Sequence, residues 1–158
     1  MTKQIALHLL LGLVWVLLTD DVNLKNLVIG LFVGGVILWY YQRARGSQAY
    51  FSRLLAGVKL CLVLLWEQLL SSLQVARLVL SPRGTIRPGI VAVPLTVTRD
   101  GEITTVANMV TLTPGSISID VSDDGRVLYV HTIDVQDPQA IVDSVRRFEA
   151  LVKGVTGS

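Results

Sequence analysis

The chain has a single cysteine, Cys61, so it can form no intrachain disulfide, and a reducing compartment is compatible with the sequence. No cysteine lies in the first apolar run, which excludes a lipoprotein anchor there. No small-x-small cleavage site precedes the Asp20-Asp21 pair, which argues against a secretory signal peptide. The basic start and short apolar core of that run keep the signal peptide as an alternative.

Charge is missing from two apolar runs, Gln4 to Thr19 and Asn26 to Gln42, which flank the polar break Asp20 to Lys25. A helix rises about 1.5 Å per residue, so each run reaches about 24 to 26 Å, slightly short of a hydrocarbon core of about 30 Å. Snorkelling flanks can cover that deficit. Residues 1–42 are therefore expected to form a hairpin of two transmembrane helices. Amphipathic rings, which prefer the headgroup level, gather near one end of each run: Trp15, Trp39, Tyr40 and Tyr41.

A third apolar stretch, Leu54 to Leu80, is long enough to span a membrane but is interrupted by Lys59, Glu67 and Arg77. At 100° per residue these charges share one polar stripe with Gln74, opposite a broad Leu/Val surface. Lys59 and Glu67 lie about 12 Å apart along the axis, too far for a salt bridge, so each is expected to meet water, a headgroup or a partner subunit.

Arginines stand on both sides of this third stretch, and the positive-inside rule assigns both clusters to the cytoplasm: Arg43, Arg45, Arg53, Arg77, Arg83 and Arg87. One crossing would separate them. Residues 43–82 are therefore expected to hold a basic loop and an amphipathic helix that lies in the plane of the inner leaflet or on a partner's helices. A third span, with Lys59 and Glu67 as intramembrane charges, remains the alternative.

The two halves of the chain differ in charge. Residues 1–87 hold nine Lys/Arg against three Asp/Glu, whereas residues 88–158 hold five against nine. A basic membrane half suits anionic lipid, and an acidic soluble half is a poor binder of nucleic acid, so that function class is excluded.

A linker at residues 83–89, rich in proline and glycine, precedes a change from helical to alternating periodicity. Residues 90–153 predict a small α+β domain with the order β-α-β-β-α, followed by a tail at residues 154–158. Its first strand runs from Ile90 to Thr98, and Pro94 in that strand indicates a sheet edge. The domain is expected to be cytoplasmic, and its small core favours docking on a partner.

The rest of the domain follows from caps and turns. Asp100 is expected to cap a helix that Thr113-Pro114-Gly115 stops, and Asp137-Pro138 caps the closing helix. Asp123-Asp124-Gly125-Arg126 predicts a hairpin turn between two strands. Three sets of apolar residues are expected to face inward: Ile117, Ile119 and Val121 in the hairpin, Ile103, Val106, Ala107 and Val110 in the first helix, and Ile141, Val145, Phe148 and Val152 in the second.

The run from Asn108 to Asp120, NMVTLTPGSISID, and the run from Asp124 to Asp134, DGRVLYVHTID, carry a family resemblance. With Ile86 to Leu95 and Gln74 to Pro82, they resemble the E subunit of the Mrp/Mnh-type multisubunit monovalent cation/proton antiporter. The resemblance covers the whole chain. It implies an accessory and assembly subunit of a bacterial plasma-membrane complex that exports sodium or a related cation against protons, with the other subunits as partners. Ser116 stands where threonine is common in that family.

Considered without the resemblance, few residues of the chain are candidates for a catalytic or metal-binding site. His131 with Asp120, Asp123, Asp124 and Asp134 is a hypothetical metal or acid-base cluster, against the simpler interpretation that Asp124-Gly125 makes the turn, Asp134 starts a loop and His131 bonds locally. Ser116 or Ser118 with His131 and Asp120 is a hypothetical triad, but no nucleophile elbow accompanies it. No catalytic, cofactor-binding or metal-binding residue is therefore assigned, and no cofactor is expected.

The first two helices carry a histidine and three glycines. His8 is expected to make a packing hydrogen bond rather than a proton relay. Gly30 and Gly34 form a G-x-x-x-G element, next to Gly35, that permits close helix approach. The sequence therefore predicts a non-catalytic antiporter subunit. The alternative is a membrane-tethered adaptor or regulatory module whose acidic domain binds a cytosolic partner.

Overall fold

The computed structural model describes residues 2–44, 46, 49–81, 86–135 and 137–157. Arg45 and Arg83, two of the arginines counted above, lie outside the described residues. The chain divides into two compact units, residues 1–54 and residues 55–158. The elements, in chain order, are the helices α1 (Thr2–Leu18), α2 (Leu24–Ala44) and α3 (Ala49–Leu80), strand β1 (Gly89–Pro94), helix α4 (Asp100–Leu112), strands β2 (Ser116–Val121) and β3 (Val127–Thr132), and helix α5 (Pro138–Thr156).

In the first unit, α1 and α2 form the predicted hairpin. Asn23 begins α2, because its side-chain oxygen accepts the backbone N–H of Asn26 at 2.7 Å. Small residues line the contact between the helices: a Cβ on Gly30 would lie 2.7 Å from the carbonyl oxygen of Gly12, and one on Gly34 would lie 3.0 Å from Cβ of Leu11. The G-x-x-x-G element therefore lies at the α1–α2 contact, as predicted.

Two helices within the described residues are long and apolar enough to cross a membrane, Leu24–Ala44 and Tyr50–Leu80. The apolar part of α1, Lys3–Leu18, is shorter. The sequence predicts that α1 and α2 span the membrane and that the third helix lies in the interface. By length and composition alone, α2 and α3 qualify.

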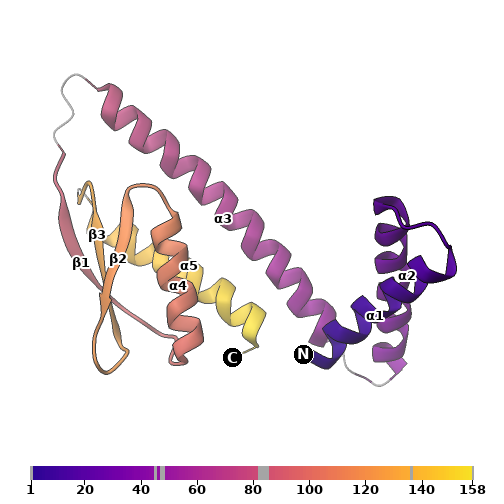
Figure 1. The fold of residues 1–158 in the computed structure, drawn as a ribbon. Helices are drawn as coiled ribbons and strands as arrows, with labels where there is room; N and C mark the ends of the chain where they lie inside the picture. The colour runs from indigo at the N-terminus through magenta and orange to yellow at the C-terminus, as the bar shows by residue number, and fades with distance from the viewer. Residues whose placement is uncertain (1, 45, 47–48, 82–85, 136, 158) are drawn as a thin grey trace. The chain divides into compact units, whose positions relative to one another are not determined.

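The second unit contains an antiparallel sheet in the order β1-β3-β2. The order of elements is the predicted β-α-β-β-α. Strand β1 lies at a sheet edge and ends at Pro94, as that proline indicated, because proline has no N–H for a ladder. All helices of this unit lie on one side of the sheet (Figure 1).

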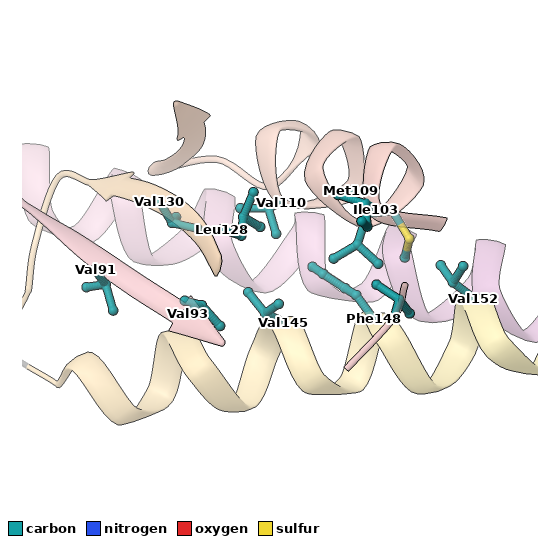
Figure 2. Packing of buried hydrophobic residues seen from close by; sticks show 12 residues of the cluster. Val91, Val93, Ile103, Met109, Val110, Leu128, Val130, Val145, Phe148 and Val152 are labelled. Carbon is teal, nitrogen blue, oxygen red and sulfur yellow. The ribbon is translucent and has the colours of Figure 1, made fainter. Parts of the chain in front are cut away.

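The core fills the space between the sheet and the helices. Figure 2 shows side chains from β1, β3, α4 and α5 converging there, with Phe148 of α5 near its centre. Phe148 is 1% exposed, and Leu128 and Val130 of β3 are fully buried. Leu60 and Leu64 of α3 pack against this cluster. The predicted inward positions of both helices of the domain are confirmed, with Ile103, Val106, Val110, Val145, Phe148 and Val152 buried.

The caps differ from expectation at one helix. Asp137 begins α5 as predicted, since its side chain accepts the backbone N–H groups of Gln139 and Ala140. Asp100 does not cap α4: Arg99 occupies that position and makes no side-chain cap bond, so that prediction was wrong. Asp100 lies in the first helical turn, where a carboxylate favours the positive end of the helix dipole.

The inward face of β2 was also predicted wrongly. Ile117 and Ile119 are 48% and 53% exposed, and only Val121 packs against the core. The register explains this, because Ser118 pairs with Val130 whereas Asp120 pairs with Tyr129, which leaves Ile119 as a bulge. One extra residue reverses which face the following side chain reaches, so Val121 turns inward while the two isoleucines point outward.

Candidate functional site

His8 is fully hydrogen-bonded between helices of the first unit. Its Nε2 lies 2.8 Å from the carbonyl oxygen of Leu31 in α2, and its Nδ1 lies 2.6 Å from the hydroxyl of Tyr50 at the start of α3. A carbonyl can only accept, so Nε2 carries the proton and Nδ1 accepts from Tyr50. The ring sits over Gly34 and Gly35, where a Cβ on Gly35 would lie 3.5 Å from Nε2. The predicted packing hydrogen bond is confirmed.

Glu67 on α3 pairs with Arg147 on α5 at 3.1 Å. The expectation that Glu67 meets water, a headgroup or a partner subunit was wrong, because its partner belongs to this chain. Beside it on the same surface, the Gln68 side chain donates to the carbonyl oxygen of Leu112 at 3.1 Å. Lys59 is exposed and makes no ion pair with any described residue.

These contacts divide the surface of α3. Leu60, Leu64 and Glu67 face the α+β domain, whereas the opposite side of the helix is apolar and exposed. Residues on that opposite side include Leu55, Leu62, Leu65, Trp66, Leu69 and Leu73. Cys61, the only cysteine of the chain, is also exposed on α3.

The hypothetical cluster around His131 is a hairpin. Asp124 organises the turn, since its Oδ1 accepts from the Ser122 hydroxyl at 2.6 Å and from the Arg126 N–H at 3.2 Å. The Ser122 hydrogen bond is the main reason why the pKa of the Asp124 carboxyl lies below its ordinary value. Gly125 adopts φ 70° in the turn, as Asp-Gly predicted.

His131 and Asp134 do not join Asp124. His131 lies on β3 and its side chain makes no hydrogen bond to any described residue, so the local bond expected for it is not found. Asp134 starts the following loop, as predicted, and its Oδ1 is buried with no hydrogen-bond partner among the residues that the structure describes. Within the described part of the chain, no group of three or more His, Cys, Asp and Glu side chains could hold a metal ion.

The hypothetical serine triad is not assembled. Ser116 donates to the carbonyl oxygens of Val110 and Thr113, and Ser118 donates to that of Ala107 at 2.8 Å. Both hydroxyls therefore link β2 to α4 through hydrogen bonds. His131 pairs with Ile117 and lies on the opposite face of the sheet from the serines, because alternate residues of a strand face opposite sides.

The buried carboxylate of Glu149 binds the backbone of the segment that connects β1 to α4. Glu149 of α5 is 1% exposed, and its Oε1 accepts the backbone N–H groups of Thr96 and Val97 at 2.5 and 2.9 Å. Lys153, one turn later, donates to the carbonyl and hydroxyl oxygens of Thr96. Glu149 was missed at the sequence level, because in the sequence it is only one polar position on an amphipathic helix.

A cleft of about 1080 Å³ separates the end of α3 from α5 and the Thr113–Ser116 corner. Its lining mixes polar and apolar residues, and the charged ones are balanced, with three arginines and three carboxylates: Arg77, Arg87, Arg147, Glu67, Asp134 and Asp137. Such a lining selects neither an anion nor a cation.

These observations define the class. Within its described residues the chain combines two helices that are candidate membrane spans with a small antiparallel sheet, which is the class of a candidate membrane protein with a small α+β domain. It belongs to the family described as Na+/H+ ion antiporter subunit, whose model matches residues 8–155.

Individual relatives are consistent with this family assignment. The chain is 35% identical over 157 residues to the Na(+)/H(+) antiporter E subunit of Bacillus subtilis strain 168, covering 99% of each protein. It is likewise 35% identical to the corresponding E subunit of Alkalihalophilus pseudofirmus, again with 99% of each covered. Among solved structures, it resembles a chain of the membrane-bound sulfane sulfur reductase, an archaeal respiratory membrane complex, with a TM-score of 0.57, 26% identity, and coverage of 96% of this chain and 99% of that one.

Proposed function

We propose that this chain is a non-catalytic accessory subunit of a multisubunit monovalent cation/proton antiporter in the bacterial plasma membrane. The observation that carries the proposal is the end-to-end match to the E subunits of sodium/proton antiporters. The polar side chains also support it, because His8, Glu67, Ser118 and Glu149 each form a hydrogen bond or ion pair within the chain, which is a structural role. The other subunits then hold the path of sodium, or of a related cation, and of protons.

The proposal includes a cytoplasmic α+β domain and an α3 that lies along the inner leaflet. Leu60, Leu64 and Glu67 bind the domain, so a span through these residues would carry the charged domain into hydrocarbon, where unpaired charges are costly. A helix with one face on a polar domain and an apolar opposite face fits the interface between lipid and water. In this arrangement the arginines flanking α3 lie on the cytoplasmic side, and the loop Asp20–Lys25 lies outside.

Depth measurements on the outer face of α3 test this arrangement. Spin labels at Leu55, Leu62 and Leu69, which are exposed on one side of the helix, are expected at similar depth. A helix perpendicular to the membrane would separate the first and last label by about 21 Å. A steady change of depth along the three sites would refute the in-plane arrangement. Labelling of a Ser122→Cys variant from outside intact cells would refute the cytoplasmic domain.

Native electrophoresis after mild detergent extraction tests the function itself. A tagged chain is expected to migrate in one large particle with polytopic partners. Deleting the chain should lower sodium/proton exchange in everted vesicles, and supplying it again should restore exchange. A free or small homomeric species in the membrane would instead support the adaptor alternative.

A further inference from the structure

The outer face of the sheet is apolar and bears no helix from the described residues of this unit. The alternation along each strand places Val91, Val93, Leu128 and Val130 inward, in the core. The intervening residues point outward, and Figure 1 shows the helices of this unit only on the other side. The outer sheet face consists of Ile90, Ala92 and Pro94 of β1, Ile117, Ile119 and Asp120 of β2, and Val127, Tyr129 and His131 of β3.

The exposed fractions on this face are large. Ile90 is 63% exposed, Ile119 is 53% exposed and Ile117 is 48% exposed. The register brings Ile90, His131 and Ile117 into one row across the sheet, with the histidine between the two isoleucines. An antiparallel sheet with one solvated face ordinarily alternates apolar and polar residues, whereas the outer face of this sheet is mostly aliphatic, with His131 and Asp120 as its polar members. Large exposed aliphatic side chains gathered on one face, as here, mark a candidate interaction site.

The distribution of side chains along β2 also indicates that the outer sheet face is covered by a partner. Before the bulge the inward residues of β2 are Ser116 and Ser118, whose hydroxyls bond to carbonyl oxygens of α4 and the corner that follows it, and after the bulge Val121 turns inward. Its largest side chains, Ile117 and Ile119, point away from the domain. The strand thus places its small residues against its own helix and its large ones on the uncovered side, which suits packing between two surfaces.

Charge around this face selects the kind of partner. Asp120 lies opposite Tyr129 in the ladder, and the adjoining hairpin turn holds Asp123 and Asp124. Residues 88–158 carry nine acidic against five basic residues. An anionic leaflet or a second acidic copy of this domain would be repelled, whereas cytoplasmic segments of polytopic membrane proteins are rich in Lys and Arg.

We propose that the outer sheet face docks a cytoplasmic segment of a polytopic partner subunit, one that carries aliphatic side chains beside Lys or Arg. The aliphatic groups pack on Ile90 and Ile117, which flank His131, and the basic groups lie against Asp120 and Asp123. This inference rests on the proposed function, because it requires that the chain sit in a complex with other subunits.

Photo-crosslinking in the intact membrane complex tests the surface. A photoreactive residue at Ile117 is expected to crosslink to a polytopic subunit, and the crosslinked peptide should contain Lys or Arg. The control position is Ala150, which is exposed on α5, away from the sheet face. A crosslink to a second copy of this chain would overturn the proposal. So would a complex that assembles without any protein crosslink from Ile117, or equal crosslinking from Ala150.

Charge substitutions provide an independent measurement. Ile117→Asp is expected to reduce the partners recovered with the tagged chain about tenfold, because a buried unpaired charge weakens an interface. Ala150→Asp should leave recovery unchanged. Asp123→Lys should reduce recovery more at low salt than at high salt, because the attraction it reverses is screened. Unchanged recovery in both Ile117→Asp and Asp123→Lys would overturn the proposal.

Two controls separate the possible failures. A thermal scan of each purified variant checks that the domain remains folded, and the crosslinking result stands if Ile117→Asp does not fold. If the wild-type chain recovers no partner at all, the proposed function fails. If it recovers partners but the outer sheet face neither crosslinks nor responds to charge, only this inference fails.

Discussion

Replacing Gly30 by alanine is expected to destabilise the α1–α2 hairpin. The added Cβ would lie 2.7 Å from the carbonyl oxygen of Gly12 and 2.8 Å from Cβ of Trp15. Neither atom belongs to the flexible end of a side chain, so the helices must move apart. Overpacking of this kind costs about 1–3 kcal/mol. Alanine also favours a helix over glycine by up to about 1 kcal/mol, so the net loss is expected near the lower end of that range.

Two other glycines on the same contact provide a graded control. A Cβ on Gly12 would lie 2.9 Å from Cδ2 of Leu31, the end of a flexible side chain that can rotate away. A Cβ on Gly35 meets the His8 ring at 3.5 Å, an ordinary contact distance. The expected order of destabilisation is therefore Gly30→Ala, then Gly12→Ala, with Gly35→Ala neutral or stabilising.

The free energy of unfolding can be measured by titrating dodecyl sulfate into the chain in mild detergent and following tryptophan fluorescence. The amount of the chain in membranes gives a second readout, because unpacked hairpins are degraded. Equal stability of the Gly30→Ala and Gly35→Ala variants would refute the reasoning, since it would show that the two helices are not in close contact at Gly30.

Three further substitutions or conditions test the second unit. Gly115 adopts φ 90°, and a Cβ there would lie 3.2 Å from the Val75 side chain, so Gly115→Val should cost about 1–3 kcal/mol and reduce the assembled complex, as quantitative blotting of native gels can show. A double-mutant cycle on Glu67 and Arg147 should give a coupling of about 0.5–1 kcal/mol in thermal unfolding, since the arginine is 54% exposed; zero coupling would contradict the contact. Folding lowers the pKa of Asp124, so the ionised carboxylate stabilises the hairpin at pH values above its ordinary pKa of 3.8 and this contribution is lost as the pH falls through the folded pKa. The loss of stability on acidification should therefore be smaller in Asp124→Asn, as thermal unfolding at a series of pH values can show.

Local patterns predicted the elements of the α+β domain because each depends on neighbouring residues. Asp137-Pro138 begins α5 through bonds to the next two amides, and the Asp124-Gly125 turn closes the hairpin. The long motifs from Asn108 to Asp134 also predicted the family, which the match over residues 8–155 confirms. Information of this kind is contained within a few consecutive residues, so it does not depend on any tertiary contact.

Other features required the tertiary structure. Period-two alternation showed that Ile117 and Ile119 share a face but not which face, and the bulge that separates them from Val121 leaves no local signal. The partner of Glu67 is Arg147, eighty residues away, and His8 bonds Tyr50 across forty-two. The sequence by itself determined the elements, the charge division and the family. Only the tertiary structure decided which surfaces are covered, because burial depends on contacts between segments that are distant along the chain.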